Sequence, residues 1–183
     1  SHGYNLLSAV IQEASGQEFL SLMRDRVWGP LTLLNTLADH TDHIIENRAA
    51  PHTRASDGRI RNAPFVDNSY KWAGGGFLST PSDLVRFGFG VLNGGIIKDA
   101  TLQLLLSPPV LPDGSIAEQN YGLGWRVYGQ DGAWIGHGGG SVGGNTFFVA
   151  HPEQNVMIAV TCNLTGCLTG NPKLADIEQL FID

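Results

Sequence analysis

The fold of this chain is decided by the stretch Ala133-Trp134-Ile135-Gly136-His137-Gly138-Gly139-Gly140-Ser141-Val142-Gly143-Gly144. A short apolar run ends at a histidine, and the glycines that follow leave the backbone open to a ligand. Because glycine has no Cβ, its main-chain N–H groups can approach a bound oxygen atom closely. The stretch predicts a strand edge suited to an oxyanion or a carboxylate, with a flexible glycine loop without chemistry as the alternative.

Composition and charge narrow the range of functions. The 183 residues are 42% hydrophobic, which is enough for one globular domain with a sizeable core. The formal net charge is −6 and no basic run occurs, so nucleic acid is not an expected partner. No apolar run reaches the length of a membrane span. Cys162 and Cys167 lie near enough to pair, which leaves the redox compartment open.

Residues 1–110 are predicted to form the mainly helical part of the chain. Apolar residues recur there at helical spacing, and glycine or proline stands where most of the runs should end. Thr80 is positioned to cap one helix, with Asp83 completing a capping box. The segment 35–70 has few periodic signals and is expected to hold only local structure. The predicted helical faces are Leu6–Ala14, Phe19–Val27, Leu84–Leu92 and Leu102–Leu106.

Residues 121–183 are predicted to form antiparallel strands and a covering C-terminal helix. The hydrophobic period changes to two residues at Tyr121, and short polar turns separate the alternating runs. Helices followed by a strand meander predict an α+β domain over residues 1–183. The last helix is expected to begin at Asn171-Pro172. The predicted strands are Tyr121–Tyr128, Ala133–His137, Asn145–Ala150 and Asn155–Thr161, with a turn at Gln130-Asp131-Gly132.

Two further motifs suggest chemistry that the spacing does not support. Asp39-His40-Thr41-Asp42-His43 matches no common metal-ligand pattern, so a solvated polar turn is predicted and no metal or cofactor is expected. Gly139-Gly140-Ser141-Val142-Gly143 matches the nucleophile elbow G-x-S-x-G, which requires a strand before the serine and a helix after it. The residues after Gly144 alternate like a strand. Ser141 is therefore not the expected nucleophile.

Five segments occur in order along the chain: Gly3–Leu7, Gly29-Pro30-Leu31, Asn68–Thr80, Tyr121-Gly-Leu-Gly-Trp125 and Gly136-His-Gly-Gly139. Together they resemble the C-terminal part of the serine β-lactamase-like group, which includes class C β-lactamases, D-alanyl-D-alanine carboxypeptidases and esterases. Residues 62–92 resemble most closely the β-lactamase-like serine proteases related to the mitochondrial one. The resemblance implies that the chain is the C-terminal portion of a β-lactamase/transpeptidase-like fold.

The resemblance also implies roles for individual residues. His137-Gly138-Gly139 stands where the family has its K-T-G triad, so His137 would align the site and the two glycines would contact substrate. Gly140 would offer its N–H as an oxyanion donor. Ser1 matches the third position of the family's Tyr-x-Asn motif, which places the tyrosine and the nucleophilic Ser-x-x-Lys upstream of this chain. Independently of the resemblance, Tyr70 and Trp72 stand beside the glycine run at residues 74–76 and are candidates to line the cleft, with core packing as the alternative for Trp72.

The activity implied by the resemblance is that of a serine hydrolase, a peptidase or esterase that forms an acyl-enzyme. Histidine in place of lysine, and serine in place of asparagine, argue against a β-lactam as the main substrate. The chain alone is expected to be inactive without its N-terminal part. The alternatives are a scaffold of the same fold that forms homo-oligomers or filaments, as mitochondrial relatives do, and a small-ligand binding module. The implied compartment is periplasmic or secreted, or mitochondrial.

Overall fold

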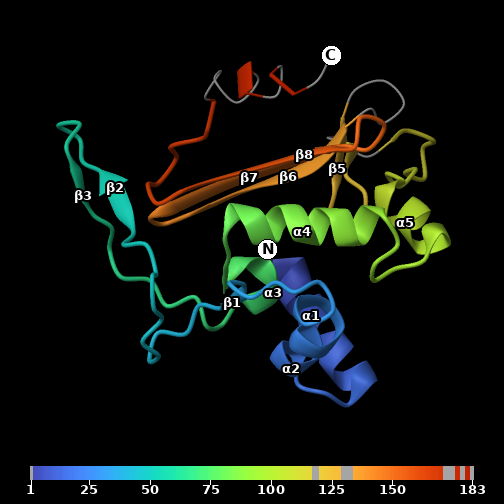
Figure 1. The fold of residues 1–183 in the computed structure, drawn as a ribbon, viewed down its shortest axis with the longest axis horizontal. Coiled ribbons are helices and arrows are strands. Elements are labelled where there is room, and N and C mark those ends of the chain that lie inside the picture. The colour runs from blue at the N-terminus through green and yellow to red at the C-terminus, as the bar shows by residue number, and fades with distance from the viewer. Residues whose placement is uncertain (1, 117–119, 129–133, 171–175, 178–179, 182–183) are drawn as a thin grey trace.

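A four-stranded antiparallel sheet lies at the centre of the computed structural model, which describes residues 2–116, 120–128, 134–170, 176–177 and 180–181. α4 (Pro81–Leu92) covers one face of this sheet, and the segment after β8 lies on the other side (Figure 1). The arrangement confirms the predicted α+β class. The strands follow the order β5 (Arg126–Tyr128), β6 (Trp134–Ser141), β7 (Gly144–His151) and β8 (Val156–Cys162).

The helical part begins with α1 (His2–Ser15), which ends where the sequence predicts. Gly16 adopts a φ of +65°, and its N–H donates to the carbonyl of Gln12 at 3.0 Å. The second predicted helix changes its hydrogen-bonding pattern along its length. The α-helix α2 (Phe19–Met23) continues directly as the π-helix η1 (Arg24–Trp28). The remaining helices are the single turn α3 (Trp72–Gly75) and α5 (Asp99–Leu106).

The start of α4 holds a neighbouring segment in place. The Thr80 hydroxyl accepts from the Asp83 N–H at 3.3 Å, as expected of an N-cap. The predicted capping box is wrong, because the fully buried Asp83 carboxylate turns away from the cap. It accepts from the Asn35 N–H at 2.8 Å, the Thr36 hydroxyl at 3.0 Å and the Arg86 guanidinium at 2.8 Å. Asp83 thereby ties residues 35–36 to the first turn of α4.

The core lies between the sheet and the helices α4 and α5. Trp125 packs edge-on against Phe148, with ring centroids 5.7 Å apart, and both side chains are buried. Gly88 permits this close packing, since a Cβ there would lie 2.4 Å from the Phe148 ring. The largest fully buried apolar side chains are those of Ile135 and Val149. β6 and β7 are thus anchored in the core along their apolar halves.

The strand predicted for Tyr121–Tyr128 forms only in its last part. Gly124 has a φ of +89°, and the Leu123 N–H donates to the Leu105 carbonyl at 2.8 Å, so residues 121–125 wrap around the end of α5 instead of extending. The predicted turn at Gln130-Asp131-Gly132 and the predicted C-terminal helix from Asn171-Pro172 fall on segments that lie largely outside the described residues.

Residues 35–70 hold only local structure, as predicted, and contain the short strands β1, β2 and β3. The β2–β3 hairpin stands out from the rest of the molecule (Figure 1), and its base is joined to the end of β8 by a 2.9 Å bond from the His52 N–H to the Asn163 carbonyl. Cys162 and Cys167 form a disulfide beside this joint.

Within the described residues, every helix is too short or too polar to cross a membrane. The two small sheets pair β1 (Leu37–Ala38) with β4 (Phe77–Leu78), and β2 (His52–Arg54) with β3 (Ile60–Asn62).

Candidate functional site

The glycine run forms a regular strand, so the loop alternative is wrong. β6 pairs with β7 along its whole length, from Ile135 opposite Ala150 to Ser141 opposite Gly144. Only Val142 and Gly143 separate the two strands. Ser141 therefore ends a hairpin strand and is followed by another strand, which excludes the strand–helix elbow that a G-x-S-x-G nucleophile requires.

β6 has one edge that is open beyond Gly136. β5 pairs with β6 only from Tyr128 opposite Trp134 to Arg126 opposite Gly136. In the part of the chain that the structure describes, no strand continues the pairing on the β5 side of β6 from His137 to Ser141. We call this side of residues 137–141 the open edge. Its backbone groups are available to a ligand.

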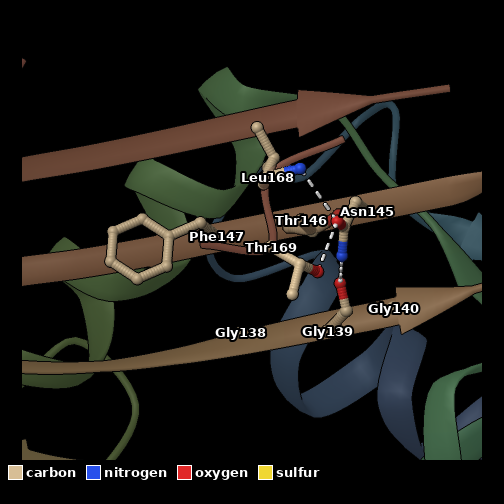
Figure 2. A pocket seen from close by; sticks show the side chains of 8 residues that line it. All are labelled: Gly138, Gly139, Gly140, Asn145, Thr146, Phe147, Leu168 and Thr169. Atoms are coloured by element: carbon tan, nitrogen blue, oxygen red, sulfur yellow. Dashed lines mark hydrogen bonds between the residues drawn. The ribbon is translucent and has the colours of Figure 1, made fainter. Parts of the chain in front are cut away.

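The glycines direct defined backbone groups to the open edge. The Asn145 side-chain amide donates to the Gly139 carbonyl oxygen at 2.7 Å, so this oxygen points toward β7 (Figure 2). In an antiparallel pair, the N–H and C=O of one residue point to the same side and those of the next residue point to the other. Gly138 and Gly140 therefore turn their N–H and C=O groups to the open edge. This is the orientation that an oxyanion donor at Gly140 needs.

His137 lies on the face of β6 that is turned toward the helices. It pairs with Phe148, whose ring packs in the core, and its Nε2 lies 2.9 Å from the Tyr121 hydroxyl. Partial burial lowers the pKa of His137, and a backbone hydrogen bond with Gly138 opposes this shift. Burial, with a contribution from the neighbouring Tyr4, raises the pKa of Tyr121 to about 12. At neutral pH the imidazole is therefore uncharged and the Tyr121 hydroxyl keeps its proton, and the tautomer of the imidazole decides which of the two groups donates.

A cavity of about 320 Å³ lies on the opposite face of β6 (Figure 2). Phe147, which pairs with Gly138, lines it, whereas Phe148 and His137 face the other way because side chains alternate along a strand. The cavity is therefore not the cleft predicted around His137. The lining residues are Gly138, Gly139, Gly140, Asn145, Thr146, Phe147, Leu168 and Thr169.

The remaining predicted site residues lie on other parts of the chain. Tyr70 is 70% exposed in the turn before α3. Trp72 begins α3 and packs against His40, with ring centroids 4.9 Å apart. Ser1 lies outside the described residues. The structure therefore brings His137, Gly138, Gly139 and Gly140 together on one strand, whereas Tyr70 is exposed elsewhere and Trp72 packs in a second cluster with His40 and His43.

That second cluster contains the described residues that best suit a metal. The donor atoms of His40, Asp42 and His43 lie within 4.8 Å of one another. Asp42 and His43 are exposed, and three residues so close in sequence are brought together by the chain itself. Two imidazoles and one carboxylate would suit a divalent transition metal, but exposed acidic groups are also common without one.

Sequence reasoning missed two residues of the site. Tyr121 belongs to the motif Tyr121-Gly-Leu-Gly-Trp125, but its contact with His137 depends on how residues 121–125 wrap around α5. The sequence predicts Asn145 only as a strand residue. The feature that marks it is a side-chain amide at the start of a strand, opposite Gly140, which has no side chain of its own.

Comparisons with known proteins agree with this geometry. The family model described as Beta-lactamase matches residues 1–179. The serine beta-lactamase-like protein LACTB, mitochondrial, of Bos taurus is 32% identical over 200 residues, which cover 88% of this chain and 36% of that protein. The chain thus spans about a third of the length of this relative.

Solved structures show the same fold. The penicillin-binding protein from Bacillus halodurans superposes with a TM-score of 0.79 at 21% identity, covering 98% of this chain and 55% of that one. The octameric penicillin-binding protein homologue from Pyrococcus abyssi gives a TM-score of 0.75 at 22% identity, covering 97% and 41%. At these identities the likeness establishes the fold alone. With the family match over nearly its whole length, the chain belongs to the beta-lactamase family.

Proposed function

We propose that this chain supplies the substrate-binding strand of a serine hydrolase that acts through an acyl-enzyme. The nucleophilic serine and lysine of Ser-x-x-Lys, and the tyrosine that moves protons with them, would belong to a segment upstream of Ser1. The observation that carries the proposal is the open edge of β6, where Gly140 turns its N–H outward. A hydrolase of this kind needs such a donor at the reacting carbonyl.

The chemistry would proceed in two halves. The serine Oγ adds to the substrate carbonyl while its proton passes to the tyrosine and lysine, and the resulting oxyanion is held by the Gly140 N–H and the N–H of the serine. The carbon–nitrogen or carbon–oxygen bond then breaks, and the leaving amine or alcohol takes the proton. Water repeats the addition, which releases the acid and restores the serine.

The outward groups of Gly138 and Gly140 favour a substrate with an extended backbone. An extended peptide can add to a free strand edge by pairing its own N–H and C=O groups with those of the strand. Glycines at both positions leave that edge without side chains that would obstruct it. Ser1 would provide a further substrate contact, as the resemblance implies, and Tyr70 and Trp72 are proposed contacts because they stand beside the glycine run at residues 74–76.

The uncharged state of His137 argues for a peptide or an ester over a β-lactam. The carboxylate of a penicillin is ordinarily met by a cation at this position, and burial lowers the pKa of His137 so that its imidazole is neutral. Through its bond to the Tyr121 hydroxyl at 2.9 Å, His137 would instead align the strand and its hydrogen bonds.

Intact mass after treatment with a fluorophosphonate tests the proposal. We expect an adduct on a longer protein that includes the upstream segment and none on the 183-residue chain. Ser141→Ala is the matched control, and the longer protein with this change should still be labelled. An adduct on the 183-residue chain that Ser141→Ala abolishes would overturn the proposal, as would the absence of labelling on the longer protein.

Self-association is a second proposed property of the whole protein. The homologue from Pyrococcus abyssi is described as octameric. In this chain, α1 has no buried residue, and the three residues of β3 are all exposed on a hairpin that projects from the molecule (Figure 1). Surfaces of this kind support an oligomer or a scaffold, and neither conflicts with catalysis.

A further inference from the structure

The peptide unit that joins Gly139 to Gly140 has two functional ends. Its carbonyl oxygen points to β7, and its N–H points to the open edge. The C=O and N–H of a trans peptide point in opposite directions, and the described chain has no cis peptide bond. Whatever fixes the direction of the Gly139 carbonyl therefore also fixes the direction of the Gly140 N–H.

This peptide unit lacks the restraint on rotation that Cβ atoms impose, so its pairing with β7 must hold it. Gly138, Gly139 and Gly140 have no Cβ atoms, so the backbone can reach conformations that other residues avoid. A rotated peptide would present a carbonyl oxygen to the open edge in place of the N–H. An oxyanion would then be repelled where it should be bound, so strand pairing with β7 needs reinforcement at this point.

Asn145 provides that reinforcement, because its side chain is held at both ends (Figure 2). Its Nδ2 donates to the Gly139 oxygen at 2.7 Å, while its Oδ1 accepts from the Leu168 N–H at 3.0 Å and the Thr169 hydroxyl at 3.4 Å. A Cβ at residue 140 would lie only 3.2 Å from this Nδ2, so glycine there leaves room for the amide.

We propose that Asn145 is a positioning residue that aims the Gly140 N–H at the open edge. It acts on the carbonyl of the shared peptide unit and does not touch the substrate. This role rests on the proposed function of Gly140 as an oxyanion donor. The segment that anchors Asn145 follows the disulfide Cys162–Cys167, so the face of the sheet away from His137 would support a reaction that takes place at its edge.

Asn145→Asp in the longer, nucleophile-bearing protein is the test. Aspartate keeps the size and the acceptor atoms of asparagine, but its ionised form has no proton to donate to Gly139. We expect kcat to fall about tenfold or more with KM nearly unchanged, a part of the ~10²–10³-fold that loss of an oxyanion donor costs. Below about pH 4 the carboxyl regains a proton, so the ratio of variant to wild-type kcat should rise again.

Asn163→Asp is the matched control. Its amide Nδ2 also donates to a backbone carbonyl, that of Ala50, at 2.9 Å, but Asn163 follows β8, which pairs with β7 and not with β6. We expect kcat within about twofold of wild type at every pH, which separates positioning from a general loss of stability. An unchanged kcat in Asn145→Asp, or a loss that acid does not relieve, would overturn the role of Asn145 alone. A wild-type protein that takes no fluorophosphonate adduct would overturn the proposed function, and this role with it.

Discussion

At the scale of the residue, the pair His137–Tyr121 has protonation states set by its surroundings. The pKa of His137 is lowered because burial disfavours the imidazolium, and the pKa of Tyr121 is raised to about 12 because burial disfavours the phenolate. Both groups are therefore uncharged at neutral pH, and the imidazole tautomer decides which of them donates. In acid both ring nitrogens of His137 carry a proton, so Nε2 donates to the Tyr121 oxygen.

Tyr121→Phe should raise the pKa of His137 toward 6.5. In the tautomer that carries its proton on Nδ1, Nε2 accepts from the Tyr121 hydroxyl, so removing the hydroxyl disfavours the neutral imidazole. NMR titration of the imidazole protons measures the shift. His151, whose pKa is also lowered by burial, is the control and should keep its value. An unchanged pKa for His137 would show that the bond does not hold the imidazole in its neutral form.

The same pKa shift makes the folded state sensitive to acid. Below about pH 6.5 the unfolded chain binds more protons at His137 than the folded chain, so this contribution to stability is complete above pH 6.5 and is lost as pH falls toward the folded pKa. Its size is limited, because solvent reaches part of the ring. Tyr121→Phe should narrow the pH window over which the loss occurs.

At the scale of the element, β6 shows how glycines on one strand differ in their tolerance of a side chain. Gly136 and Gly138 face the same side, but a Cβ at Gly136 would lie 2.3 Å from the Phe148 carbonyl oxygen. A Cβ at Gly138 would make only ordinary contacts, the nearest at 3.8 Å from the Thr146 oxygen. The buried half of the strand therefore needs glycine for packing, and the half with the open edge does not.

Gly136→Ala and Gly138→Ala should change stability in opposite directions. We expect Gly136→Ala to lower the free energy of unfolding by about 1–3 kcal/mol, because backbone atoms must move apart. Gly138→Ala should raise it by about 0.4–1 kcal/mol, because alanine has fewer conformations to lose on folding. Urea unfolding of the chain measures both. Equal effects of the two changes would contradict this account of the strand.

Most of the longer helices and the β7–β8 hairpin could be predicted from the sequence because each depends on local spacing and on turn residues such as glycine or proline. Gly16, for example, ends α1 as its position indicates. The early end predicted for the glycine strand and the early start predicted for β5 were wrong, since neither the pairing of β6 with β7 nor the wrap of Gly124 around α5 is a local property. In the same way, a motif predicted His137 and Gly140, whereas register and packing alone bring Asn145 and Tyr121 to them.

At the scale of the whole molecule, α1 leaves apolar side chains in solvent. It contacts α2 and α3, yet none of its residues is buried, and Leu6 and Val10 are 68% and 55% exposed. Exposed apolar patches of this kind mark surfaces that pack against other protein. The proposed self-association and the proposed upstream segment would each supply a cover for this helix.

Replacing Leu6 and Val10 together with lysine should reduce self-association of the 183-residue chain and its binding of a hydrophobic dye. The melting temperature should change little, since exposed substitutions usually alter stability by less than about 0.5 kcal/mol each. Light scattering after size exclusion and dye fluorescence measure the two effects. Ile44→Lys is the control, because Ile44 is 99% exposed outside any helix. The same response from both variants would show that α1 has no special part in association.

The open edge of β6 carries a hazard that its composition reduces. A strand edge kept free for one backbone also invites the strands of other molecules, and such edges are where proteins begin to aggregate. Glycine has a poor tendency to remain in strands and offers a neighbour no side chain to pack against. Three in succession, at Gly138–Gly140, make the edge a weak template for an unwanted strand. The lack of side chains at the open edge therefore has two effects. It lets a substrate reach the backbone, and it also protects the molecule against misassembly.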